Sequence, residues 1–85
     1  MTKAFLEFNV TDRESFVEFI ELLHADFQTN SEEWENKTLG EFLEAMSRYA
    51  EGIQGYYNNT KQPVNADEAS WTLFADIFKG STMYE

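Results

Sequence analysis

The chain has 85 residues, with 16 Asp or Glu against 6 Lys or Arg, and a formal net charge of −10 at pH 7. This length suits one domain with a small core, and eight Phe, four Tyr and two Trp are too many for a disordered acidic chain. Since such a charge repels nucleic acid and attracts basic surfaces, we expect one folded acidic domain over residues 1–85 that does not bind nucleic acid directly.

The sequence also limits where the protein works. There are no cysteines, so disulfides and thiolate metal sites are excluded. Residues 1–7 lack the apolar run of a signal peptide, and no segment approaches the roughly 20 apolar residues of a membrane span. We therefore expect a cytoplasmic protein that does not associate with membranes.

The first elements are an N-terminal arm and a helix. Apolar residues between Phe5 and Val10 predict a short strand or an extended arm that packs on the helices. A helix follows at about residues 12–29, with Thr11 as its N-cap and Glu14 completing a capping box. Its apolar stripe has helical spacing and consists of Phe16, Phe19, Ile20, Leu23 and Phe27.

An acidic connection and a second helix come next. Trp34 lies among acids in the connection, and we expect its indole to pack back onto the core. Thr38 and Glu41 predict a second capping box, and the helix that they begin is expected to end between Gly55 and Asn58.

The third helix is predicted to begin after Asn65 as its N-cap, with Asp67 and Glu68 in its opening turn and Gly80 just past its end. Its expected inner face consists of Trp71, Phe74, Ala75 and Phe78. Leu73 and Ile77 lie off that stripe, which indicates burial on two sides. The sequence thus predicts a mainly α domain of three principal helices with a short extended N-terminal arm.

No pattern of residues indicates catalysis or a cofactor. His24 is the only histidine and lies at the flank of the first apolar stripe, which is typical of a residue at the core boundary. Glu32, Glu33 and Glu35 are close in sequence, but the spaced ligands and mid-loop Gly of a calcium loop are missing. The glycines form no phosphate-binding cluster. We therefore expect no enzyme activity, no cofactor and no dedicated metal site.

The acidic surface is the strongest functional signal. Glu14, Glu18 and Glu21 form a line on one helix face, with neighbours roughly 6 Å apart, which is comparable to the spacing of phosphates along a DNA strand. Such a line is able to imitate nucleic acid in a basic groove, or it simply keeps the protein soluble.

Several short motifs resemble those of a known family. The chain reads EWENKTL at 33–39, FLEA at 42–45, GYYNN at 55–59 and QP at 62–63, followed by Ser70-Trp71, Phe74-Ala75 and Tyr84-Glu85. In these motifs it resembles a family of small bacterial domains of unknown function, over roughly Phe16 to the C-terminus. The resemblance implies a compact domain without a defined activity. It draws attention to six residues, for which there are two interpretations. They form a binding patch, or the aromatic ones are core residues and the asparagines form turns: Trp34, Asn36, Tyr56, Tyr57, Asn58 and Trp71.

These observations favour a non-enzymatic protein-interaction module whose partner has a basic surface. The leading hypothesis is an inhibitor or immunity-type protein that occupies a basic nucleic-acid-binding groove by mimicking DNA, through Glu14, Glu18, Glu21, Glu32, Glu33 and Glu35. One alternative is a small-ligand or peptide-binding domain that uses a patch of Trp34, Tyr56, Tyr57 and Trp71. Another is an accessory subunit whose apolar face is completed by another chain. The sequence leaves the oligomeric state open.

Overall fold

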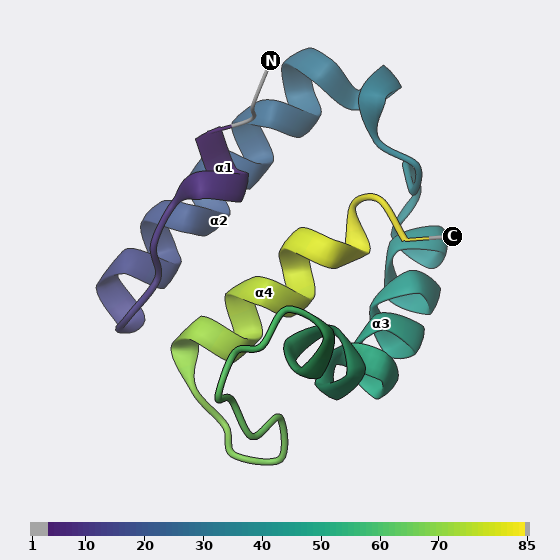
Figure 1. The fold of residues 1–85 in the computed structure, drawn as a ribbon. Coiled ribbons are helices and arrows are strands. Elements are labelled where there is room, and N and C mark those ends of the chain that lie inside the picture. Colours follow the sequence, from purple (N-terminus) through teal and green to yellow (C-terminus); the bar gives the residue numbers. More distant parts are fainter. Residues whose placement is uncertain (1–3, 85) are drawn as a thin grey trace.

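The computed structural model describes residues 4–84. Its elements are α1 (Ala4–Glu7), α2 (Arg13–Asn30), the 3-10 turn η1 (Ser31–Glu33), α3 (Leu39–Asn59) and α4 (Trp71–Ser81). No strand occurs within these residues. Helix α4 lies between α2 and α3 and contacts both, more extensively on the α3 side (Figure 1). The predicted mainly α fold of three principal helices is confirmed.

The N-terminal arm packs on the helices, but its first part is helical. Ala4–Glu7 form one helical turn instead of a strand or extended segment, which buries Phe5 to 1% exposure. The following residues are tied to α4 by its side chains, since Lys79 Nζ donates to the Phe8 carbonyl at 2.9 Å and Thr72 Oγ1 to the Val10 carbonyl at 2.6 Å. These bonds satisfy the carbonyls of Phe8 and Val10 without a neighbouring strand.

Helix α2 begins one residue later than its predicted capping box implies. Asp12 is the N-cap, and its carboxylate accepts from the Ser15 backbone N–H at 2.8 Å while Ser15 Oγ accepts from the Asp12 N–H at 3.1 Å. Ser15 Oγ also donates to the Asp12 carboxylate at 2.6 Å, and this bond, followed by the bond from the Ser15 N–H, lowers the pKa of Asp12. The predicted cap at Thr11 with Glu14 is therefore wrong, because Asp12 and Ser15 have the same spacing and form the reciprocal hydrogen bonds one residue later.

The first core cluster surrounds Trp34, which is 6% exposed. Its indole N–H donates to Asp26 Oδ2 at 2.7 Å, and its ring packs on Phe27 and Phe42 with centroid distances of 5.0 and 6.0 Å. The buried members come from four parts of the chain: Phe5, Val10, Phe19, Leu23, Trp34 and Ala75. The prediction that Trp34 packs onto the core is confirmed.

Helix α3 begins as predicted and continues further than predicted. Thr38 Oγ1 accepts from the Glu41 N–H at 3.1 Å, and the Glu41 carboxylate accepts from the Thr38 N–H, so the capping box is confirmed. The helix ends at Asn59, past the predicted limit, because Ile53 and Tyr57 are buried against Leu73 of α4 in a second cluster. Burial of this face sustains the C-terminal half of the helix despite Gly52 and Gly55.

Helix α4 starts later than predicted. Ser70 is its N-cap and accepts from the Leu73 N–H at 3.0 Å, whereas Asn65 closes only a local turn by accepting from the Asp67 N–H at 2.9 Å. Gly80 lies inside the last turn instead of past the end. The prediction of burial on two sides is confirmed, since Leu73 joins the second cluster and Ala75 the first. Both clusters therefore meet at α4.

Candidate functional site

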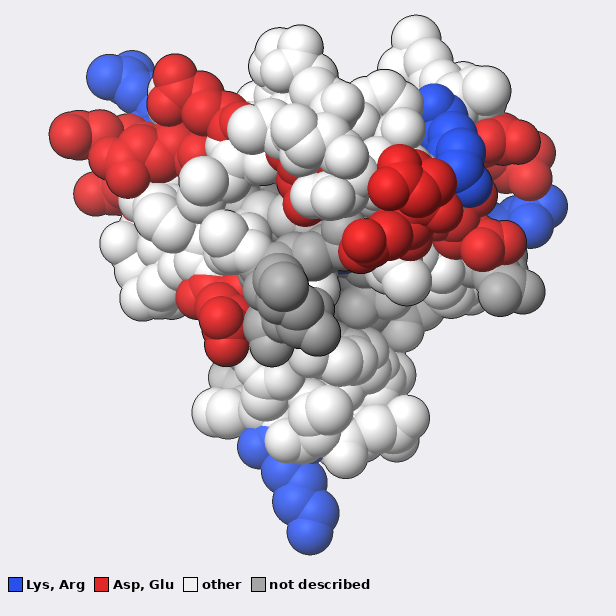
Figure 2. All heavy atoms as spheres, turned by 90° about the horizontal axis from the view of Figure 1, so that it is seen from above, with Lys and Arg blue, Asp and Glu red and all other residues white. Residues whose placement is uncertain are grey.

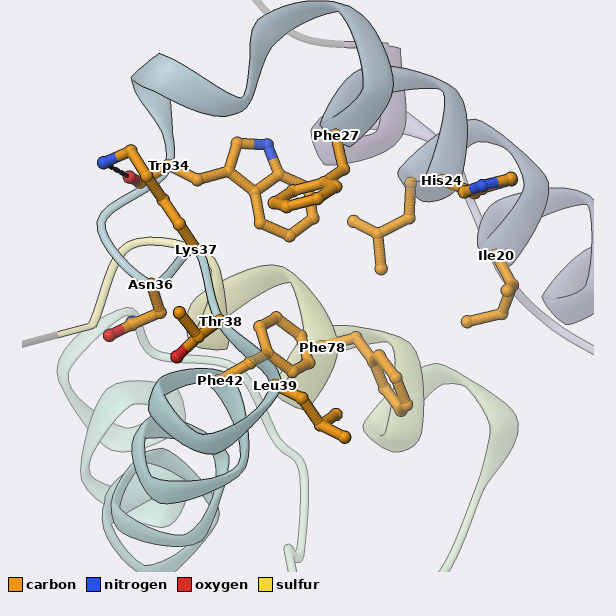
Figure 3. Close-up of a pocket in the computed structure, with 11 residues that line it drawn as sticks. Ile20, His24, Phe27, Trp34, Asn36, Lys37, Thr38, Leu39, Phe42 and Phe78 are labelled. Atoms are coloured by element: carbon orange, nitrogen blue, oxygen red, sulfur yellow. Dashed lines mark hydrogen bonds between the residues drawn. The ribbon is translucent and has the colours of Figure 1, made fainter.

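An apolar groove lies between α2 and α3, with α4 as its floor. Its first hollow, of about 300 Å³, is bounded by α2 side chains that include Ile20 and Phe27, by Leu39 and Phe42 of α3, and by Phe78 of α4 (Figure 3). A second hollow, of about 510 Å³, continues along α3 and shares Phe78 with the first. We call these two hollows together the α2–α3 groove. The second hollow is lined by Phe16, Leu43, Met46, Ser47, Ala50, Phe74, Ile77 and Phe78.

Large apolar side chains in this groove are uncovered. Leu39 is 74% and Leu43 is 53% exposed, and Phe74 on the floor is 38% exposed. Trp71, also 38% exposed, packs on groove residues Phe16 and Phe74 with centroid distances of 5.4 and 6.1 Å. Contiguous apolar surface of this kind marks interaction sites in folded proteins.

Polar groups occur mainly at the end of the groove near Trp34, and most of them already serve the fold. Lys37 Nζ donates to the Trp34 carbonyl at 2.7 Å, a bond drawn in Figure 3. Asn36 donates to the carbonyls of Ser81 and Tyr84 at 2.9 and 2.6 Å, which ties the connection to the C-terminal segment. Among the described residues that line the two hollows, none is Asp or Glu. The groove therefore offers apolar contacts and few hydrogen bonds, which suits the apolar side chains of another molecule.

The histidine predicted at the core boundary lies at this groove. His24 is an exposed residue of α2 that lines the first hollow. In the part of the chain that the structure describes, no three His, Asp or Glu side chains are grouped so as to hold a metal ion. Because it lines the first hollow, His24 adds a polar group to the α2 wall of the groove.

The predicted acidic contact residues lie elsewhere. Glu14, Glu18 and Glu21 are exposed on the face of α2 opposite its buried residues, Phe19 and Leu23. The other predicted glutamates, Glu32, Glu33 and Glu35, are exposed in η1 and the connection after it. Between Glu21 and Glu32 the chain has one acid, Asp26, and no Lys or Arg. Figure 2 shows acidic side chains of one face gathered mainly on two sides, with smaller acidic patches and uncharged surface between them.

The four aromatic residues of the predicted ligand patch are not brought together. Trp34 is buried in the first cluster, and Tyr57, 1% exposed, is buried in the second. Tyr56 packs on Tyr57 at 5.6 Å but is 44% exposed, while Trp71 lies against Phe16. Trp34 and Tyr57 thus have core roles. Of the four residues, Trp34 also lines the first hollow of the groove, and Trp71 packs on groove residues Phe16 and Phe74.

The groove cannot be recognised from residue spacing in the sequence, because its residues follow the same apolar spacing as core residues. Leu39, Leu43 and Met46 continue the apolar spacing of α3, and Phe74 continues that of α4. Periodicity identifies the apolar face of a helix but does not tell whether another element covers it. The number of apolar stripes is the one indication of such a groove in the sequence. The three helices make too little contact with one another to cover every apolar stripe.

Comparison with known proteins relates the chain to one family. Neither the curated proteins nor the solved structures gave a match. A model of a family of unknown function matches residues 12–85, a range that includes α2, α3 and α4 and so both walls and the floor of the groove. The predicted resemblance to small domains of unknown function is confirmed at this level. The chain belongs to this family of unknown function, DUF7660.

Proposed function

We propose that this protein is a non-enzymatic interaction domain whose α2–α3 groove binds an amphipathic helix of a partner protein, with basic residues beside the helix's apolar face. The observation that carries the proposal is the exposure of Leu39 and Leu43, 74% and 53%, next to two connected apolar hollows. No helix within residues 4–84 is long and apolar enough to cross a membrane.

The shape of the groove favours a helix as its occupant. Two helices form its walls and a third forms its floor, so a further helix would complete a four-helix arrangement. The two hollows follow one another along α3 and share Phe78, which suits two successive sets of apolar side chains. An amphipathic helix presents such sets at positions i, i+3 or i+4, and i+7.

Charge favours a basic partner. The net charge is −10, and both helices that form the walls carry exposed carboxylates outside the groove, Glu14 and Glu21 on the outer face of α2 and Glu44 and Glu51 on α3. An acidic helix would meet repulsion from both sides, whereas Lys and Arg beside the apolar stripe would be attracted during the encounter. In this arrangement apolar contacts in the groove provide the affinity, and the acids of the surrounding surface attract the basic partner during the encounter.

The hypothesis of an acidic inhibitor that mimics DNA stays as a second candidate. The observation that favours it is the exposed line of Glu14, Glu18 and Glu21. In that case the carboxylates themselves contact a basic nucleic-acid-binding groove of the partner, and the apolar groove does not take part. The two candidates differ in which residues contact the partner.

Fluorescence anisotropy with labelled synthetic helices separates the two candidates. The probes are an amphipathic Leu/Lys peptide and a Leu/Glu peptide with the same apolar positions. We expect the Leu/Lys peptide to bind and the double variant Leu39→Ser, Leu43→Ser to bind it at least about tenfold more weakly, because two large apolar contacts are lost. Leu6→Ser is the matched control, since Leu6 is a 40% exposed leucine on α1.

Charge reversal completes the experiment. Changing Glu14, Glu18 and Glu21 to Lys should weaken peptide binding less than the leucine changes do, and mainly at low salt. Loss of binding on charge reversal, with full binding by the leucine variant, would favour the DNA-mimic candidate. Equal binding of both peptides, unaffected by either set of changes, would contradict both candidates.

A further inference from the structure

A different hollow, of about 580 Å³, lies on the other side of α4 from the groove. It is lined by α4 residues Asp76, Lys79 and Gly80, which lie on a different face of the helix from Phe74 and Phe78. Three tyrosines line it as well, Tyr49 and Tyr56 from α3 and Tyr84 from the C-terminal segment. We call it the tyrosine hollow.

The tyrosine rings form a curved aromatic wall. Tyr49 is at its centre, with its ring centroid 6.5 Å from that of Tyr56 and 5.4 Å from that of Tyr84. The interplanar angles are 47° and 69°, so the ring faces point in different directions. A Cβ atom at Gly80 would overlap the Tyr49 ring, so glycine at this position allows the ring to lie directly on the α4 backbone.

Asp76 brings a carboxylate to this wall. Its Oδ2 accepts from the Tyr57 hydroxyl at 2.7 Å. Burial, and then the bond to Asp76, raises the pKa of Tyr57, so this hydroxyl keeps its proton and holds the carboxylate in place. No donor among residues 4–84 bonds to Oδ1 of Asp76, which leaves that oxygen available to a ligand.

The cation that also lines the hollow is already engaged. Lys79 Nζ donates to the Phe8 carbonyl at 2.9 Å and lies 5.7 Å from the centroid of the Phe19 ring. Since Phe19 belongs to the first core cluster, the ammonium group is directed to that cluster. A ligand in the hollow would therefore meet the tyrosine faces and the Asp76 carboxylate, beside the apolar side chains of Leu6 and Met83.

We propose that the tyrosine hollow binds a quaternary ammonium group. The faces of aromatic rings attract cations, and a methylated ammonium contacts them through CH groups without needing hydrogen-bond acceptors. The Asp76 carboxylate and the net charge of −10 add long-range attraction. The inference is independent of the groove, because it involves different residues and the opposite side of α4.

Heteronuclear NMR titration with choline tests the site. The control ligand is 3,3-dimethyl-1-butanol, which has the same shape without the charge. We expect choline to shift the signals of Tyr49, Tyr56 and Gly80 and the neutral alcohol to bind far more weakly. Tyr56→Leu should weaken choline binding by about two- to thirtyfold, the range of one cation–π contact. Asp76→Asn should also weaken it, because the attracting charge is lost. Leu43→Ser, in the α2–α3 groove, should leave it unchanged.

Two peptides distinguish a free ligand from a modified protein. One carries trimethyllysine and the other the same sequence with unmodified lysine. Binding of the methylated peptide with an affinity well above that of choline would identify a protein ligand, and equal or weaker binding would identify a small molecule. The proposal is overturned if the neutral alcohol binds as well as choline, if choline causes no shifts, or if Tyr56→Leu leaves its affinity unchanged. Tyr56 is 44% exposed, so this last variant tests the site even if Asp76→Asn disturbs the fold.

Discussion

The seam between α3 and α4 and the groove between α2 and α3 contain the same kinds of apolar side chain, but those in the seam are buried and those in the groove are exposed. In the seam, Ile53 and Leu73 are 2% and 5% exposed. In the groove, Leu39 and Leu43 on the same α3 helix are 74% and 53% exposed. Ile53 of α3 packs against Leu73 of α4, whereas no helix covers Leu39 and Leu43, because α2 and α3 lie on different sides of α4 (Figure 1).

This difference separates residues that hold the fold from residues that are available to a partner. A buried apolar side chain stabilises the domain by roughly 1.5–3 kcal/mol, whereas an exposed one contributes little until something covers it. Substitutions in the two regions should therefore have opposite signatures. Changes in the clusters should lower stability, and changes in the groove should lower affinity.

The largest effect is expected at the centre of the first cluster. Phe19 is 0% exposed, so Phe19→Ala should lower the free energy of unfolding by about 3–5 kcal/mol, which is a large share of the stability of a small domain. Urea denaturation followed by circular dichroism measures it. Val17→Ala on the same helix, where Val17 is 52% exposed, is the control and should change stability by no more than about 0.5 kcal/mol. Similar losses in the two variants would contradict the assignment of the core.

The seam between α3 and α4 also contains a buried hydrogen bond. Tyr57→Phe removes the donor to Asp76, and we expect a loss of about 1–3 kcal/mol in the free energy of unfolding. If thermal and urea unfolding show no loss, the bond does not stabilise the seam.

Because of Tyr57, the free energy of unfolding is also expected to depend on pH. Burial raises the pKa of Tyr57 and of Tyr49 above the ordinary value, so the folded state favours the protonated hydroxyls. Their contribution to stability is therefore complete below pH about 10 and is lost as the pH rises beyond it. Denaturation from pH 8 to 11 should show this decline in the wild type and a shallower one in Tyr57→Phe. A steeper decline in the variant would contradict this account.

A smaller effect is expected at the start of α4. Ser70 accepts from the Leu73 N–H at 3.0 Å, and Ser70→Ala should lower the free energy of unfolding by about 1 kcal/mol. Asn65→Ala is the matched comparison, since Asn65 closes a turn but does not begin the helix. A larger loss at Asn65 than at Ser70 in urea denaturation would contradict the position at which α4 begins.

The smallest effect on stability is expected in the groove itself. Leu43→Ser removes a 53% exposed side chain, so it should change the free energy of unfolding by about 0.5 kcal/mol or less. A loss comparable to that of Phe19→Ala would show that Leu43 is a core residue and that the groove is closed.

Much of the fold followed from local signals in the sequence. Thr38 and Glu41 have the spacing of a capping box and form one, and the stripe from Phe16 to Phe27 faces the core. Errors occurred where two signals competed. Thr11 with Glu14 and Asp12 with Ser15 have the same spacing, and Asn65 and Ser70 are both good N-caps. Tertiary contacts, which the sequence does not reveal, decided between them.

The groove could not be predicted in the same way. Leu39 and Leu43 look like core residues in the sequence. Their exposure depends on the direction that the chain takes after α2 ends at Asn30 and passes through η1. The tyrosine hollow depends on the packing of α3 against α4, which brings Tyr49 onto Gly80 across 31 positions of sequence. Long-range packing of this kind has no local signature.

The central claim is that the α2–α3 groove is the contact surface for a partner helix. The most direct test is a methyl NMR titration of the protein with the amphipathic Leu/Lys peptide. We predict shifts at the methyl groups of Leu39, Leu43 and Met46 in the groove, with none at Leu6 and Met83, which line the tyrosine hollow. Shifts confined to Leu6 and Met83, or binding that leaves every groove methyl unchanged, would contradict the claim.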